Sequence, residues 1–168
     1  VQLSGTTSGL YNLVTGPLGG SVGTHDIDGG ITSIRSPNIV LPTLSGNETL
    51  DLSLSYYFAY NNTATVDDYL RITVEGATNT VILNELGDGT IYKGVWETLT
   101  ANLDSYAGQT ITLLIEATDG GVGSISEAAI DDVKIIKTGS AGGGGSQSPT
   151  VPGDPSGDTN STDGTATI

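Results

Sequence analysis

The chain has 168 residues, with five Lys and Arg against 19 Asp and Glu, and no Cys. A formal net charge of -14 argues against binding to nucleic acid or to an anionic membrane surface, because both need clusters of basic side chains. Without Cys there is neither a disulfide framework nor a thiolate metal site, and no stretch approaches the roughly 20 apolar residues of a membrane span.

The composition predicts an all-β protein. With 25 Gly, 6 Pro and many Thr, Ser, Asp and Asn, it is typical of short strands joined by tight turns. No Met is present, so Val1 cannot be an initiator. We therefore expect either an exported chain, extracellular or at the cell surface, whose signal peptide has been removed, or a fragment of a longer protein.

The chain divides into an N-terminal segment (1–23), a folded domain (24–137) and a tail (138–168). Leu10–Val14 predicts a first short strand. After the sequence HDIDGG come two further short strands, Ile31–Arg35 and Asn38–Leu41. Pro37 separates them, since proline cannot donate a hydrogen bond within a sheet.

Thr49–Tyr60 is the strongest predicted strand, because apolar residues alternate along its full length. The apolar face consists of Leu50, Leu52, Leu54, Tyr56, Phe58 and Tyr60. We expect this strand to cross the centre of a sheet with that face on the core. The alternative is that Tyr56, Phe58 and Tyr60 form an exposed platform on which sugars stack. Four more aromatic residues could add to such a platform: Tyr57, Tyr69, Tyr92 and Trp96.

Five more strands follow at spacings near ten residues. They are predicted at 69–75, 80–86, around Trp96, at 110–117 and at 124–136. A turn is predicted at 87–89 and a turn or single helical turn at 104–109, with Asp104 or Ser105 as its cap. This number and spacing of strands favour a two-sheet antiparallel β-sandwich.

The last predicted strand carries an acidic cluster within an apolar run. By strict alternation, Glu127, Asp131 and Val133 should share one face, with Ile130 and Asp132 on the other. Carboxylates in such surroundings destabilise the fold unless they are neutralised, and the chain has few cations to do so. A hard metal cation is the simplest means of neutralising them.

Calcium takes six to eight oxygen ligands, which several loops can supply together. The predicted ligands are Asp26, Asp28, Asn61, Asp67, Asp68, Glu127, Asp131 and Asp132. Asn62 and Asp119 belong to the same acidic loops. The hypothesis is that Ca²⁺ bridges the DIDGG loop, or the loop 61–68, to the last strand. Alternatively, all these acids are ordinary solvated turn residues, since a chain with 19 acidic residues has local acid pairs by chance. DIDGG by itself lacks the complete EF-hand pattern.

Six segments in order carry a family resemblance. They are DIDGGITSIRSPNIVLP, LSLSYYFAY, DDYLRITVEG, Trp96, LDSYAGQTITLLIEATD and SEAAIDDVKI. Together they resemble the jelly-roll modules, loosely called MAM-like, that are appended to secreted bacterial proteases and other exoenzymes. The resemblance implies a two-sheet jelly roll, structural calcium and an accessory or adhesive role without catalysis.

Catalysis is not expected from the sequence. His25 is the only histidine, and the chain has neither Cys nor a nucleophile elbow. A solvated loop histidine is the simpler interpretation. Glycoside hydrolysis needs a pair of carboxylates, but so acidic a chain contains many possible pairs, and none of them identifies a site.

The tail is rich in Gly, Ser, Thr and Asp and contains no aromatic or cationic residue. It predicts either a flexible linker or a strand, Thr165–Ile168, that adds to a neighbouring sheet. The first functional hypothesis is a calcium-stabilised subunit for assembly or adhesion, forming filaments by strand addition with copies of itself or other cell-surface proteins. The alternative is an accessory glycan- or substrate-binding module of a larger secreted enzyme.

Overall fold

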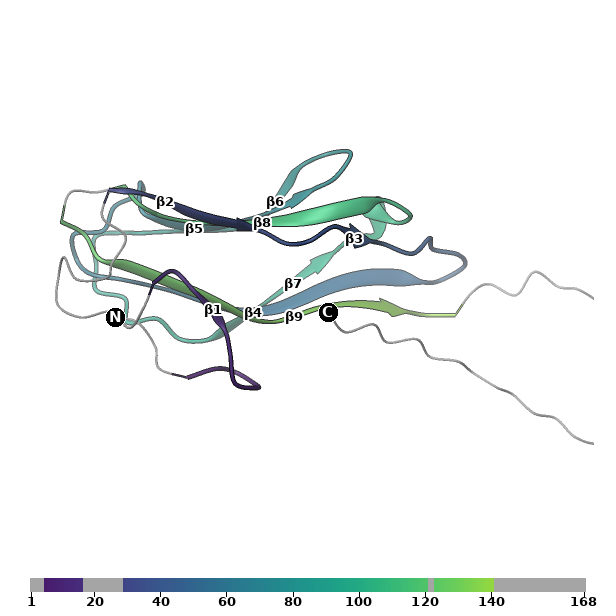
Figure 1. Ribbon diagram of the computed structural model, residues 1–168, viewed down its shortest axis with the longest axis horizontal. Coiled ribbons are helices and arrows are strands. Elements are labelled where there is room, and N and C mark those ends of the chain that lie inside the picture. The colour runs from purple at the N-terminus through teal and green to yellow at the C-terminus, as the bar shows by residue number, and fades with distance from the viewer. Residues whose placement is uncertain (1–4, 17–28, 121–122, 141–168) are drawn as a thin grey trace, which may run out of the picture.

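Two antiparallel sheets lie face to face in the computed structural model, which describes residues 5–16, 29–120 and 123–140 (Figure 1). Sheet A has the strand order β1-β9-β4-β7, and sheet B the order β2-β8-β5-β6, with β3 pairing with β8. The strands are β1 (Leu13–Val14), β2 (Gly30–Arg35), β3 (Ile39–Val40), β4 (Thr49–Tyr60), β5 (Tyr69–Glu75), β6 (Thr80–Leu86), β7 (Glu97–Asn102), β8 (Thr110–Asp119) and β9 (Ser126–Thr138). The predicted two-sheet antiparallel β-sandwich of jelly-roll type is confirmed.

The core between the sheets is built on β4, whose bounds match the prediction. Its alternating residues from Leu50 to Tyr60 are all buried and pack with the inward side chains of sheet B, such as Ile72 and Leu113. The exposed-platform alternative for Tyr56, Phe58 and Tyr60 is therefore wrong. Their rings are only 3–7% exposed, because the face they share with the leucines is the core face.

A smaller cluster covers the outer face of sheet A. Tyr57 is fully buried there with Ala59 and Ala129, and Val14 and Trp96 pack against them. The rings of Tyr57 and Trp96 meet edge to face, with centroids 5.0 Å apart and planes at 82°. Such a pair adds about 0.5–1.5 kcal/mol to the burial of the two rings.

Two local predictions differ from the structure. The first strand begins at Leu13, not Leu10, because Leu10 and Tyr11 are more than 80% exposed and have no core to pack on. The short helix η1 (Asp104–Tyr106) is capped by neither predicted residue: Leu103 is its N-cap, without a side-chain hydrogen bond. The Asp104 carboxylate instead accepts a hydrogen bond from the Leu50 N–H at 2.7 Å and so ties η1 to β4.

The strict alternation predicted for the last strand holds from Glu127 to Asp131 but is wrong beyond Asp131. The register of β9 on β4 shifts after Asp131, and Asp132 has a positive φ of 52°. This bulge inserts one residue, so Ile130 and Val133 both face the core although they differ in parity. The bulge thereby places the two adjacent aspartates at a kink in the strand.

Within the described ranges, no helix is long and apolar enough to cross a membrane. The N-terminal segment joins the sandwich through β1, which pairs with Ile130 and Ala129 of β9. The boundaries at residues 23 and 137 stay predictions.

Candidate functional site

Two acids meet at the end of the sandwich where β5 begins and β8 ends. Asp119 continues the inward face of β8, and the pairing of Tyr69 with Thr118 places Asp68 beside it. Both are almost fully buried, at 0% and 1% exposure. The Ser124 hydroxyl contacts both carboxylates, at 3.2 Å from Asp68 and closer to Asp119. The Ser124 hydroxyl therefore bridges two like-charged side chains at this end of the sandwich.

Asp68 also organises the backbone around it. Its carboxylate accepts hydrogen bonds from the N–H groups of Thr65, at 2.6 Å, and Gly120, at 2.8 Å. Gly120 lies so close to the loop before β5 that a Cβ there would be 2.7 Å from the Asp67 carbonyl oxygen. The carboxylate therefore holds two loops together.

The loop 61–68 contacts the connection between β8 and β9. The Asn61 N–H donates to the Ile125 carbonyl at 3.1 Å, and the Thr63 hydroxyl donates to the Gly123 carbonyl at 3.0 Å. The Asn61 side chain, however, accepts hydrogen bonds from Thr63 within its own turn. Asp67 is exposed. Of the predicted ligands in this loop, only Asp68 is buried.

Glu127 and Asp131 lie elsewhere. They are opposite Ala59 and Ser55 of β4, on the same outer face of sheet A as Tyr57. Glu127 is buried, and its carboxylate accepts a hydrogen bond from the Thr15 hydroxyl at 2.8 Å. The structure thus separates these acids from Asp68 and Asp119, which face the space between the sheets.

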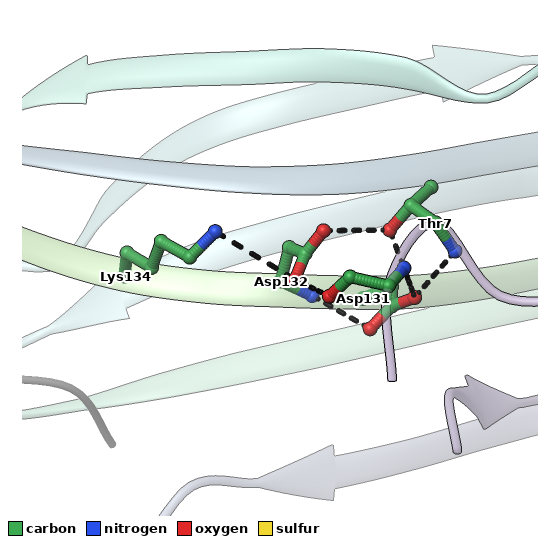
Figure 2. Close-up of polar contacts among 5 residues, drawn as sticks. Thr7, Asp131, Asp132 and Lys134 are labelled. Carbon is green, nitrogen blue, oxygen red and sulfur yellow. Dashed lines mark hydrogen bonds and ion pairs between the residues drawn. The ribbon is translucent and has the colours of Figure 1, made fainter. Parts of the chain in front are cut away.

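The adjacent aspartates of the β9 bulge bind the N-terminal segment, forming what we call the latch: Thr7, Ser8, Asp131 and Asp132. Figure 2 shows the Thr7 hydroxyl directed at both carboxylates, 2.8 Å from each. The Thr7 N–H donates to Asp131 at 2.8 Å, and the Ser8 hydroxyl to Asp132. On its other side Asp132 lies 3.6 Å from the Lys134 ammonium.

Hydrogen bonding lowers the pKa of both latch carboxyls. At Asp131, burial acts to raise the pKa, but the hydrogen bonds from Thr7 and from nearby backbone N–H groups together outweigh it. At Asp132, the bonds from Ser8 and then Thr7 lower the pKa. Both groups are therefore ionised at neutral pH and anchor the segment.

Only some of the predicted calcium ligands lie where they could bind one ion together. No three His, Cys, Asp or Glu side chains within the described ranges gather around one point. The Asp68–Asp119 pair supplies the oxygen donors that Ca²⁺ prefers. Asp26 and Asp28 lie outside the described residues, although Gly30, two residues after Asp28, pairs with Asp119. Calcium binding at this end stays a prediction.

A different site lies between the edge strands β6 and β7, where the sequence pointed to the tyrosines but not to the acids. Glu85 pairs with Leu70 and Glu97 pairs with Tyr56, so both glutamates are on the inward faces of their strands. The Tyr56 hydroxyl lies 3.3 Å from each carboxylate. One acid from each sheet therefore reaches the same buried tyrosine.

Two further tyrosines extend this site. The rings of Tyr60 and Tyr92 lie 5.6 Å apart, and their backbones form an isolated bridge. The Tyr92 hydroxyl donates to Glu97 at 3.0 Å, and Tyr60 hydrogen-bonds to Asp88. We call these six residues the tyrosine–carboxylate cluster: Tyr56, Tyr60, Glu85, Asp88, Tyr92 and Glu97.

The cluster keeps its phenols protonated. Burial and then the charges of Glu85 and Glu97 raise the pKa of Tyr56, while burial and then Asp88 raise that of Tyr60. The hydrogen bond to Glu97 raises the pKa of Tyr92. The three carboxylates are exposed and the Tyr92 ring is half-buried. The cluster thus offers solvent an aromatic surface edged by hydrogen-bond acceptors.

The sequence held a signal for this cluster. Glu85 has the same parity as the buried Leu83, and Glu97 the same parity as Leu99, so each glutamate interrupts an inward face. An inward charge on an edge strand also discourages edge-to-edge aggregation, which is its simplest structural role. Alternation alone does not reveal that the two glutamates meet.

No protein-family model matches the sequence, and no curated protein matches it either. Among solved structures, one described as "Family 16 Carbohydrate Binding Module-2" is 14% identical, with a TM-score of 0.40 over 74% of this chain and 83% of the other. One described as "CBM4 structure and function" is 18% identical, with a TM-score of 0.28 over 67% of this chain and 91% of the other. A third, "Structure of infectious bursal disease virus Gx strain", is 13% identical, with a TM-score of 0.25 over 80% and 32%. At these TM-scores the likenesses carry no argument about function.

Proposed function

We propose that this chain is a non-catalytic binding module that takes a neutral glycan at the tyrosine–carboxylate cluster. The observation that carries the proposal is the half-buried Tyr92 ring beside the exposed carboxylates of Glu85 and Glu97. Glycan hydroxyls donate to carboxylates, while the C–H face of a sugar ring packs on an aromatic ring. Binding sites commonly combine an aromatic wall with a few convergent polar groups.

The same geometry argues against hydrolysis. In a glycosidase the scissile bond lies between two carboxylates that face each other across the substrate. Here the Tyr56 hydroxyl stands within 3.3 Å of both Glu85 and Glu97 and takes that place. The cluster is therefore suited to holding a sugar and not to cleaving it.

The ligand is proposed to be neutral because of charge. The chain carries a net charge of -14, and the cluster itself contains three carboxylates. An acidic polysaccharide would be repelled by this field. A neutral glycan outside the cell agrees with the predicted export and with the predicted role as an accessory of a secreted enzyme.

Isothermal titration calorimetry against a panel of soluble neutral polysaccharides tests the proposal. Tyr92→Ala should weaken binding about tenfold, or about 1.4 kcal/mol, whereas Tyr92→Phe should retain most of the ring contribution. Tyr11→Ala is the matched control, because Tyr11 is 86% exposed and belongs to no part of the cluster. If the unmodified chain binds none of the panel, or if Tyr92→Ala binds as tightly as Tyr11→Ala, the proposal is wrong.

Assembly and adhesion through copies of the chain, the first hypothesis from the sequence, stay predictions. The membership suggested by the resemblance to modules of secreted proteases also stays a prediction. The edge of β9 is where the described residues offer room for an added strand, and this edge does not include the tyrosine–carboxylate cluster.

A further inference from the structure

One edge of β9 is fully paired and the other is largely open. On one side β4 pairs with β9 from Ser126 to Thr138, interrupted at the bulge after Asp131. On the other side β1 pairs with it only at Ala129 and Ile130. Within the described part of the chain, no strand lies beside the edge from Val133 to Thr138. Its free N–H and C=O groups are a template for another strand.

An apolar groove runs beside this open edge. It has a volume of about 710 Å³ and lies between the segment 34–42 and the last part of β9. Val133 and Ile135 line it from β9, and core residues such as Leu113 line it as well. At its rim Val40 is 77% exposed and Ile34 is 46% exposed. A groove of this kind suits a strand that sends apolar side chains inward.

The tail contains one segment with the right pattern. In residues 141–168 there are a run of four glycines, three prolines and three aspartates, all of which disfavour pairing within a sheet. Thr165–Ile168 is different, since three of its four residues are β-branched. In a strand, Ala166 and Ile168 share one face and the two threonines share the other.

Chain length favours the tail of the same molecule over that of a second copy. The open edge covers six residues, about 20 Å at 3.4 Å per residue. Residues 141–164 connect the end of the described chain to the segment, and Gly-rich chains of that length have a mean end-to-end distance of about 25–30 Å. A linker matched to its span gives an effective concentration in the mM range.

We propose that Thr165–Ile168 adds as a strand to the Val133–Thr138 edge of its own chain, with Ala166 and Ile168 seated in the groove. The tail then completes sheet A on the side where β1 is too short. This interaction surface is separate from the proposed glycan site, because the groove is at the β2–β9 edges and the cluster is at the β6–β7 edges.

Amide hydrogen exchange measured by NMR on the full chain tests the proposal. The amides between Val133 and Thr138 that point away from β4 should be protected in the unmodified chain. Ile168→Asp should raise their exchange rates at least tenfold, because the charge cannot enter the groove. Thr167→Asp is the matched control: it adds the same charge on the opposite face and should leave exchange unchanged. Trp96 fluorescence checks that each variant is folded.

Equal exchange in the Ile168→Asp variant and the unmodified chain would overturn the proposal, as would equal effects of both variants. Dilution distinguishes the source of the strand. Protection that is constant over a hundredfold dilution supports addition within one chain. Protection that falls on dilution, together with a dimer mass in light scattering, would assign the strand to a second copy and overturn the intramolecular proposal.

Discussion

Glu85 and Glu97 belong to different sheets, yet the Tyr56 hydroxyl lies 3.3 Å from each of their carboxylates. The pairing of Leu70 with Glu85 and of Tyr56 with Glu97 shows that both glutamates face inward at an edge of the sandwich. This relationship makes the β6–β7 edge polar and aromatic, whereas the β2–β9 edge is apolar. The first consequence of this arrangement is that the stability of the fold should fall at alkaline pH.

Alkaline pH should destabilise the fold through the cluster. The pKa values of Tyr56 and Tyr60 are raised in the folded chain, so the unfolded chain loses these protons first. The stability they contribute is complete below the ordinary tyrosine pKa and is lost as pH rises above it. Thermal melts between pH 8 and 12 should show a smaller loss for Tyr56→Phe. An identical pH profile for Tyr56→Phe and the unmodified chain would contradict this.

Calcium should stabilise the chain through Asp68 and Asp119. If Ca²⁺ binds there, a concentration 100 times the dissociation constant adds about 2.7 kcal/mol to the free energy of unfolding. Differential scanning calorimetry with Ca²⁺ and with EDTA measures the shift in Tm. Asp68→Asn should abolish the shift, and Asp51→Asn, at a partly exposed acid on β4, should retain it. A Tm that EDTA does not change would refute calcium binding.

Acid should release the N-terminal segment. The pKa values of Asp131 and Asp132 are lowered, so the latch is complete above the ordinary aspartate pKa and is lost as pH falls below it. Hydrogen exchange of residues 5–14 should therefore rise in acid before the core exchanges. Thr7→Val should produce the same release at neutral pH, because it removes the hydroxyl shared by both carboxylates. Thr6→Val, whose hydroxyl donates to the Gly9 carbonyl, is the control.

The bulge in β9 should accept glycine better than valine. Asp132 has a φ of 52°, a conformation that β-branched residues resist and glycine adopts freely. Asp132→Gly loses the latch contacts but keeps the backbone, so its Tm should exceed that of Asp132→Val. Equal Tm values would show that the bulge relaxes without strain.

Gly120→Ala should loosen the acidic end. A Cβ at Gly120 would lie 2.7 Å from the Asp67 carbonyl oxygen, so the loops must separate, at about 1–3 kcal/mol of unfolding free energy. Urea denaturation measures this change. Gly30→Ala is the matched control, since a Cβ there meets nothing within 4 Å. The contact is unimportant if the two variants unfold at the same urea concentration.

The sequence by itself determined the fold, because strict alternation from Leu50 to Tyr60 permits only one face on the core, and the same period recurs in the later strands. It also pointed to the acids at the β8–β9 end. Only the tertiary structure decided which acids meet. A one-residue bulge at Asp132 reversed the predicted faces of β9 from Val133 onward, and long-range packing brought Glu85 to Glu97 and Asp68 to Asp119. Alternation is a local property of each strand, whereas contacts between strands depend on register and sheet order, which no single stretch encodes.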